Sequence, residues 1–231
     1  MKRKARSAIA TGIMIASGLL ALTGGPLVSE AAAVPPFAVV ENQTYGASYG
    51  EWGARWWQWV LSIPAAVNPV LDQSGANCAR GQYDTVWFLA GSFGGSVTRV
   101  CTVPAGKPLF FPMLNGGAFK PKGFESLLDL RNLAGASLNT ATALVCTVDG
   151  ADCAADLFKF RASTPSFTVI APAKGLIPPG QLTVPGNTDS MVADGYWMLL
   201  QPLPPGQHTV RLGGTMADGF TVDVTYLLTV Q

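Results

Sequence analysis

Frequent glycine and proline restrict the fold of this chain more than any other feature of its sequence. The 231 residues include 26 glycines and 17 prolines, and these residues separate short apolar runs. Such a pattern is typical of many strands joined by tight turns, and it disfavours long helices. Residues 220–230 are the clearest case, because apolar side chains at even positions alternate with mostly polar ones at odd positions. We therefore expect one face of that strand in the core and the other in solvent.

The C-terminal segment predicts a three-stranded antiparallel meander. Its apolar runs YWMLLQP, QHTVRLGG and FTVDVTYLLTV are separated by the turn sequences LPPG and MADG. Earlier strand candidates are TVWFLAG, VTRVCTV and KPLFFPML. Pro108 and Pro112 place the last of these near a sheet edge or at a bulge, because proline cannot donate to a central ladder. The fold expected is mainly β: one antiparallel β-sandwich of jelly-roll type over residues 34–231.

A tryptophan-rich segment, YGEWGARWWQWVLSIP, interrupts the strand pattern at residues 49–64. Its apolar residues recur at helical spacing, which predicts an amphipathic helix over about residues 48–63. Ser48 followed by Glu51 fits a capping box, and Pro64 ends the helix. Each tryptophan buries about 150–250 Å², so most of this indole surface must face the protein. The helix is expected to cover the sandwich.

Two further segments depart from the strand pattern. Residues 123–135 carry apolar side chains at helical spacing, at positions 124, 127, 128, 130 and 133, and predict a short second helix. Residues 171–190 are rich in proline and glycine and hold few large apolar groups. Most of that segment is expected to be a surface loop.

Residues 1–33 have the pattern of a secretory signal peptide. A basic start is followed by an apolar stretch at 8–22 and by three alanines at 31–33. Cleavage after residue 33 would remove four of the 15 basic and one of the 14 acidic residues, which leaves a net charge of −2. A nearly neutral chain without a Lys/Arg cluster does not have the charge of a nucleic-acid-binding protein. We expect a secreted, periplasmic or cell-envelope protein without a membrane span.

The four cysteines all follow the predicted leader, and an even number in an exported chain predicts disulfides. The expected pairs are Cys78 with Cys101 and Cys146 with Cys153, because each pair brackets a local segment. A four-cysteine zinc site is the alternative, but the spacings do not contain the close C-x-x-C pairs that such sites favour.

Three carboxylates are weak candidates for catalysis: Glu51, Asp72 and Asp194. A glycosidase needs two acids about 5–10 Å apart, and the best pair combines Glu51 with Asp72 or with Asp194. Asp72 also lies in LDQSGANC, a weak calcium pattern for which an ordinary turn is the favoured alternative.

GASYG at residues 46–50 matches the nucleophile pattern G-x-S-x-G, and Asp194 and His208 follow in the order of an α/β-hydrolase. A nucleophile elbow requires a parallel sheet that alternates with helices, whereas this sequence predicts antiparallel strands. Ser48 is better explained as a helix cap. His208 is the only histidine, so sites that need two imidazoles are excluded, and a structural role is expected for it. No metal and no cofactor are predicted.

The candidate ligand-binding residues are Trp57, Arg55 and Gln58. Trp57 lies about 100° around the helix from Trp56, off the main apolar face, where its indole is available to stack against a sugar ring or to pack under a loop. The leading hypothesis is a non-catalytic extracellular or envelope-associated protein that binds a glycan. The alternatives are an extracellular polymer-degrading enzyme acting through carboxylates near Glu51, and a structural or assembly protein.

The strings WWQWVLSIP, CTVPAGKPLFFP and DGYWMLLQPLPPGQHTV resemble segments of exported bacterial proteins, and PLPPGQHTV resembles connections between strands in extracellular sandwiches. This resemblance concerns architecture, and function does not follow from fold.

Overall fold

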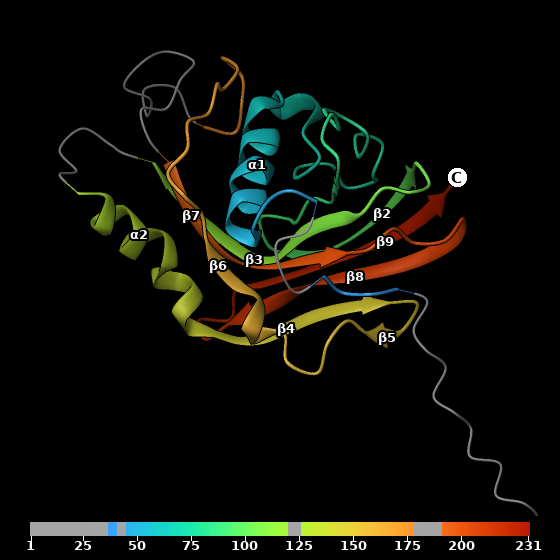
Figure 1. Cartoon of the computed structure of the whole chain (residues 1–231). Coiled ribbons are helices and arrows are strands. Elements are labelled where there is room, and N and C mark those ends of the chain that lie inside the picture. The colour runs from blue at the N-terminus through green and yellow to red at the C-terminus, as the bar shows by residue number, and fades with distance from the viewer. Residues whose placement is uncertain (1–36, 41–44, 120–125, 178–190) are drawn as a thin grey trace, which may run out of the picture. The chain divides into compact units, whose positions relative to one another are not determined.

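The structure is a computed structural model that describes residues 37–40, 45–119, 126–177 and 191–231. In these residues the chain is mainly β, with two sheets and two α-helices (Figure 1). The predicted signal peptide at 1–33 and part of the predicted loop, residues 178–190, lie outside the described residues. The part of that loop that is described, residues 171–177, contains no helix or strand, as expected.

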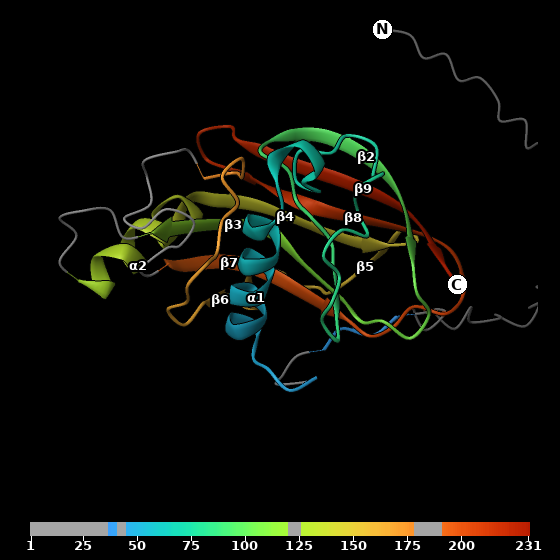
Figure 2. The ribbon, with the colours of Figure 1, turned by 90° about the horizontal axis from the view of Figure 1, so that it is seen from above.

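The four-stranded sheet has the order β1 (Trp87–Phe88), β3 (Leu109–Phe119), β7 (Met191–Leu200) and β6 (Arg161–Ser163). The five-stranded sheet has the order β2 (Gly95–Val103), β9 (Thr221–Val230), β8 (Gly206–Met216), β4 (Ala141–Val148) and β5 (Ala151–Asp152). In Figure 2 the strands β2, β9, β8 and β4 run side by side.

Two strand pairs differ from the antiparallel arrangement that the sequence predicts. β1 is parallel to β3, and β2 is parallel to β9. Each pair joins strands that are not consecutive in the chain: β2 lies between β1 and β3, and belongs to the other sheet. Parallel neighbours need a long connection, and both pairs have one: β2 separates β1 from β3, and the six strands β3 to β8 separate β2 from β9.

The predicted C-terminal meander is only partly correct. β8 and β9 form the expected antiparallel hairpin, but β7 pairs with β3 and β6 in the other sheet. All ten residues of β7 are buried, so this strand needs a covered surface on both faces. The four-stranded sheet provides this, because it lies between the five-stranded sheet and a helix.

Alternate residues of β3 and β7 enter two separate cores. Phe111 and Met198 face the five-stranded sheet, in one cluster with residues of β2, β4, β8 and β9. Phe110 and Trp197 face the other way, toward helix α1 (Tyr49–Ser62), and their rings stack at 5.4 Å. In Figure 1, α1 and the five-stranded sheet accordingly lie on opposite sides of β3 and β7.

The N-terminal helix confirms the prediction from the tryptophan-rich segment. Ser48 is the N-cap, and its side chain and that of Glu51 form the expected capping box. The helix ends at Ser62, two residues before Pro64. Three of its tryptophans are buried against the four-stranded sheet: Trp52, Trp56 and Trp59.

The second helix, α2 (Leu127–Ala136), begins four residues later than predicted, and residues 120–125 lie outside the described residues. The buried face also differs from the prediction. Leu127, Leu128 and Leu133 are exposed, whereas Leu130 and Ala134 pack on Ala118 and Val192. Small residues let the helix approach the sheet closely, since a side chain at Gly116 would meet the Ala134 carbonyl at 2.9 Å.

Three short 3₁₀ segments complete the described helices: η1 (Ala65–Val67), η2 (Ser137–Thr140) and η3 (Phe158–Phe160). Pro112 lies at a bulge of β3, where the register with β7 shifts. On the side of β3 opposite β7, β1 pairs only with residues 109 and 110. Pro112 has no N–H to donate, and its position therefore interrupts no pairing with β1. The expectation of a bulge is confirmed.

Both predicted disulfides are present, Cys78–Cys101 and Cys146–Cys153, with Cα–Cα distances of 6.0 and 5.4 Å. The zinc alternative is therefore wrong. The first bridge fastens a loop across the edge of β2, where the Val100 N–H donates to the Ser74 carbonyl at 2.8 Å. Gly75 approaches the Val100 carbonyl so closely, at φ +91°, that a side chain there would collide with it.

Candidate functional site

One open depression combines an exposed aromatic ring with charged and amide groups. It has a volume of about 380 Å³. Helix α1 contributes Arg55, Gln58 and Trp59, and the segment after it contributes Gly81, Tyr83, Asp84 and Phe88. We call these seven residues the Tyr83 surface.

Hydrogen bonds hold in place the loop that contributes one wall of the Tyr83 surface. The Trp59 indole N–H donates to the Arg80 carbonyl at 2.7 Å. Gln82 donates to the carbonyls of Cys78 and Phe88, and its own amide oxygen accepts the Phe88 N–H at 2.9 Å. These contacts fix the loop against α1, so the position of the surface is set by the fold.

Charged groups lie along one side of this surface. The Arg55 guanidinium is 3.5 Å from the Asp84 carboxylate and lies over the Trp52 ring at 4.4 Å from its centroid. The Arg55 side chain is 43 % exposed, so the ion pair contributes at most about 1 kcal/mol to stability. Its donors remain accessible to a ligand.

Tyr83 is 96 % exposed, the most exposed of the large apolar side chains described. Its ring therefore contributes almost nothing to the core. Gln58 is also exposed, and its Nε2 donates to the Thr168 carbonyl at 3.0 Å. An exposed aromatic ring thus lies beside an amide and a guanidinium that carry hydrogen-bond donors.

Trp57 does not line the Tyr83 surface. Its ring meets that of Trp56 edge to face at 5.4 Å, and a side chain at Gly117 of β3 would touch it at 3.2 Å. Trp57 is two residues from Arg55, which places the two about 160° apart around a helix with 3.6 residues per turn. The structure thus keeps Arg55 and Gln58 together and separates Trp57 from them.

The three candidate catalytic carboxylates belong to separate networks. Glu51 caps α1, and the hydrogen bonds from the Ser48 backbone and side chain lower its pKa. Asp72 accepts the N–H groups of Ser74 and Asn77 and the Ser74 hydroxyl. Its burial raises the pKa, but those hydrogen bonds outweigh burial and lower it. Each of these two acids stabilises a local turn.

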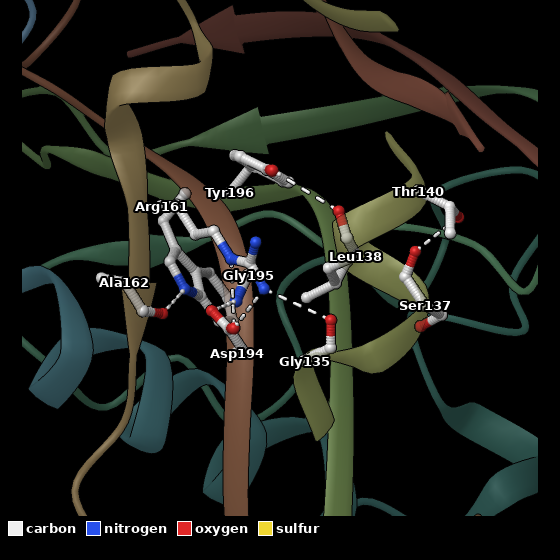
Figure 3. A network of polar contacts seen from close by, with 10 residues as sticks. Gly135, Ser137, Leu138, Thr140, Arg161, Ala162, Asp194, Gly195 and Tyr196 are labelled. Carbon is white, nitrogen blue, oxygen red and sulfur yellow. Dashed lines mark hydrogen bonds and ion pairs between the residues drawn. The ribbon is translucent and has the colours of Figure 1, made fainter. Parts of the chain in front are cut away.

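Asp194 joins β7 to β6 and α2 (Figure 3). Its Oδ2 accepts two bonds from Arg161, at 3.1 and 2.8 Å, and its Oδ1 accepts the Gly195 N–H. Arg161 also donates to the Gly135 carbonyl of α2 at 3.3 Å and lies over the Tyr196 ring. The hydrogen bonds that Arg161 donates to Asp194 raise the pKa of Arg161. The buried acid holds the helix on the sheet.

The three residues of the hydrolase hypothesis also have separate partners. The Ser48 hydroxyl donates to Glu51, and Asp194 binds Arg161. The ring nitrogens of His208 lie 2.7 Å from the Asp149 carboxylate and 2.9 Å from the Pro204 carbonyl. His208 therefore has the structural role expected for it, joining two turns at one end of the five-stranded sheet.

The calcium pattern around Asp72 forms a turn, because the two Asp72 oxygens accept hydrogen bonds from the backbone of that same loop. Among the described residues, no group of three or more His, Cys, Asp or Glu side chains is arranged to hold a metal ion. In that same part of the chain, no helix is long and apolar enough to cross a membrane.

Comparison of the chain with protein-family models, with curated proteins and with solved structures found no match. The case for a function therefore depends on the geometry of the site. The sequence patterns above do not include Tyr83 and Asp84, although a single tyrosine in the polar segment RGQYDT, at 80–85, is a usable signal. An aromatic ring among polar, turn-forming residues has few apolar neighbours to pack against, so such a ring is expected to be exposed.

Proposed function

We propose that this protein is a non-catalytic glycan-binding protein, and that the Tyr83 surface is its binding site. The observation that carries the proposal is the exposed ring of Tyr83 beside Arg55, Gln58 and Asp84. A sugar ring presents an apolar C–H face and an edge of hydroxyl groups. Tyr83 would stack on the face, while the guanidinium and amide would donate to the hydroxyls and Asp84 would accept from them.

The proposal retains Arg55 and Gln58 as ligand-binding residues and replaces Trp57 by Tyr83 as the stacking ring. It favours binding over polymer degradation, because Glu51, Asp72 and Asp194 are each engaged in hydrogen bonds of different turns or strands. It also favours binding over assembly, because a loop and a disulfide cover the edge of β2 at Val100 and Cys101.

We further propose that residues 34–231 are the exported form, and that the two sheets constitute a β-sandwich of jelly-roll type. Two disulfides fit an oxidising compartment, such as the periplasm, the cell envelope or the extracellular space. These are the compartments in which a protein meets extracellular glycans. The parallel pairs β1–β3 and β2–β9 are departures from the antiparallel connections of that fold type.

The test begins with a glycan array that uses the purified, disulfide-bonded protein. The tightest oligosaccharide is then titrated against wild type and variants, with tryptophan fluorescence as the readout, because Trp59 lines the surface. Tyr83→Ala and Arg55→Ala are each expected to weaken binding about tenfold, which corresponds to about 1.4 kcal/mol. Tyr45→Ala is the matched control, since Tyr45 is an exposed tyrosine that does not line this surface.

Unchanged affinity in both Tyr83→Ala and Arg55→Ala would overturn the assignment of the surface. Loss of binding in Trp57→Phe, with binding retained in Tyr83→Ala, would show that the binding site lies on the Trp57 side of α1. No binding to any glycan on the array would overturn the proposed function itself.

A further inference from the structure

Arg55 and Arg211 are both about half exposed, and each lies beside an aspartate, but they use their hydrogen-bond donors differently. Arg211 donates to both oxygens of Asp223, at 2.8 and 3.1 Å. Arg55 lies 3.5 Å from Asp84, and within the described residues its guanidinium makes no hydrogen bond. A guanidinium carries five N–H donors in a planar fork. The donors of Arg55 are therefore not used by the fold.

The Asp84 carboxylate does not pair with that fork because the next residue holds it. Its Oδ1 accepts the Thr85 N–H at 2.7 Å and the Thr85 hydroxyl at 3.3 Å. The same oxygen is the atom that lies 3.5 Å from Arg55. A bidentate pair would need both carboxylate oxygens to face the guanidinium. Asp84 is thus oriented by its own turn, and the bidentate position at Arg55 is left to a ligand.

The Trp52 ring supports the guanidinium of Arg55 from within the protein. The central guanidinium carbon lies 4.4 Å from the ring centroid, and Trp52 is fully buried. Arginine stacks on aromatic rings through its flat face, whereas it donates hydrogen bonds in its own plane. Contact with the indole therefore orients the guanidinium and leaves its donors available at the Tyr83 surface, which Arg55 lines.

The other charges near Arg55 are one cation and one acid. The Lys107 ammonium donates to the Asp84 backbone carbonyl at 2.6 Å, and it makes no ion pair in the part of the chain that the structure describes. Glu51 lies one turn before Arg55 on α1, and its carboxylate accepts from the Ser48 backbone and side chain. Both nearby acids are thus hydrogen-bonded within their own turns, whereas the two cations keep donors for an anionic acceptor.

We propose that the Tyr83 surface selects an acidic sugar, whose carboxylate pairs with Arg55. This inference rests on the proposed glycan-binding function and names the ligand class of that site. In a uronic acid the carboxylate lies at the edge of the sugar ring, so the ring would stack on Tyr83 while both carboxylate oxygens accept from the guanidinium. Hydrogen bonds between two charged groups are roughly twice as strong as neutral ones. Lys107 would add attraction, and Asp84 would oppose the ligand's charge.

The experiment compares one oligosaccharide in two forms. The tightest uronic-acid glycan on the array is titrated before and after chemical reduction of its carboxylates to hydroxymethyl groups. Tryptophan fluorescence gives both dissociation constants, and their ratio is the readout. Wild type is expected to bind the acidic form about tenfold more tightly, as a charge-assisted pair in place of a neutral hydrogen bond would provide. Added salt should reduce this preference, because exposed charges are screened.

Three variants assign the preference to its residues. Arg55→Gln keeps an amide donor without the charge and should abolish the preference for the acidic form. Asp84→Asn should increase the preference, because it removes a charge that repels the ligand's carboxylate. Arg211→Gln is the matched control, since it removes the same charge from a similarly exposed arginine that does not line the surface. The control should leave the preference unchanged.

Equal affinity of wild type for the two forms, or an array on which only neutral glycans bind, would overturn the acidic ligand and leave the proposed glycan-binding function intact. An array on which no glycan binds would overturn that function, and this inference with it. An equal loss of preference in Arg55→Gln and Arg211→Gln would overturn the role of Arg55, because net charge alone would then explain the result. A lower preference in Asp84→Asn would overturn the position of the carboxylate beside Arg55.

Discussion

The guanidinium Nη1 of Arg99 lies 2.9 Å from the hydroxyl oxygen of Tyr226, and both side chains are almost fully buried. Arg99 also donates to four backbone carbonyls, those of Val70, Asp72, Ala90 and Gly91. A single side chain of β2 thus ties two separate loops to the sheet. One of these loops contains Cys78, whose carbonyl accepts from Gln82 next to the Tyr83 surface, and the other contains Gly91, which lines a cavity together with Trp56 and Trp57.

Replacing Arg99 by lysine is expected to lower the free energy of unfolding by about 3 kcal/mol or more. Lysine keeps the charge, but its ammonium group cannot reach five acceptors in the planar arrangement of a guanidinium, so buried carbonyls would lose their donors. Urea unfolding followed by tryptophan fluorescence measures the change. A loss below about 1 kcal/mol, within the range of surface substitutions, would contradict this role.

Tyr226→Phe tests the same cluster from its other side. The Tyr226 hydroxyl donates to the Ala90 carbonyl and accepts from the Ala90 N–H and from Arg99. Burial raises the pKa of this phenol, so it remains a neutral donor at working pH. We expect a loss of about 1–3 kcal/mol. Tyr196→Phe serves as the control and should cost clearly less, because the Tyr196 hydroxyl donates to the Leu138 carbonyl at the long distance of 3.5 Å.

The tryptophans of α1 should differ in their contribution to stability. Trp56 is 3 % exposed and its indole N–H donates to the Leu89 carbonyl at 2.9 Å. Trp56→Ala is therefore expected to cost about 3–5 kcal/mol, as other buried aromatic truncations do. Trp57 is less buried and its N–H is unpaired, so Trp57→Ala should cost clearly less. Equal losses in urea melts would show that Trp57 is as much a core residue as Trp56.

Features that depend on local chemistry were predictable from the sequence. The spacing of Ser48, Glu51 and Pro64 sets both ends of α1, and alternation in residues 220–230 identifies β9 and its buried face. The disulfide pairs followed from short separations. In each case the deciding contacts join residues that are close in the chain.

Features that depend on distant contacts were not predictable. The sequence of β7 does not determine which sheet this strand joins, so its pairing with β3 could not be predicted. The burial of Arg99 depends on four carbonyls from two loops. Tyr83 and Asp84 lie at the same surface as Arg55 because the loop folds back on α1. Tyr83 follows Arg55 by 28 residues in the chain.

The attachment of α2 should depend on Asp194. Asp194→Ala would leave Arg161, whose side chain is 31 % exposed, without its carboxylate partner. Because that guanidinium is partly solvated, we expect a moderate loss of about 1–3 kcal/mol. Gly135→Ala should act on the same contact, since an added methyl group would lie 2.9 Å from Asp194 Oδ2. In both variants, amide hydrogen exchange relative to wild type should increase more in α2 than in β8. An equal increase in α2 and β8 would contradict the role of Asp194 in holding α2.

The loop that Arg99 holds should lose stability in acid through Asp72. Hydrogen bonds from Asn77 and Ser74 outweigh burial and give Asp72 a pKa below its ordinary value in the folded protein. A lowered folded-state pKa stabilises the protein at pH values above the unfolded pKa of about 4, and this contribution disappears as the pH falls through the folded pKa.

Asp72→Asn removes the charge at every pH. Its destabilisation relative to wild type should thus be about 1–2 kcal/mol at neutral pH and should shrink steadily below about pH 4. Urea melts at a series of pH values, with Asp152→Asn of the exposed strand β5 as the control, measure this difference. A difference that stays constant down to the acid limit of folding would show that the charge of Asp72 does not stabilise the loop.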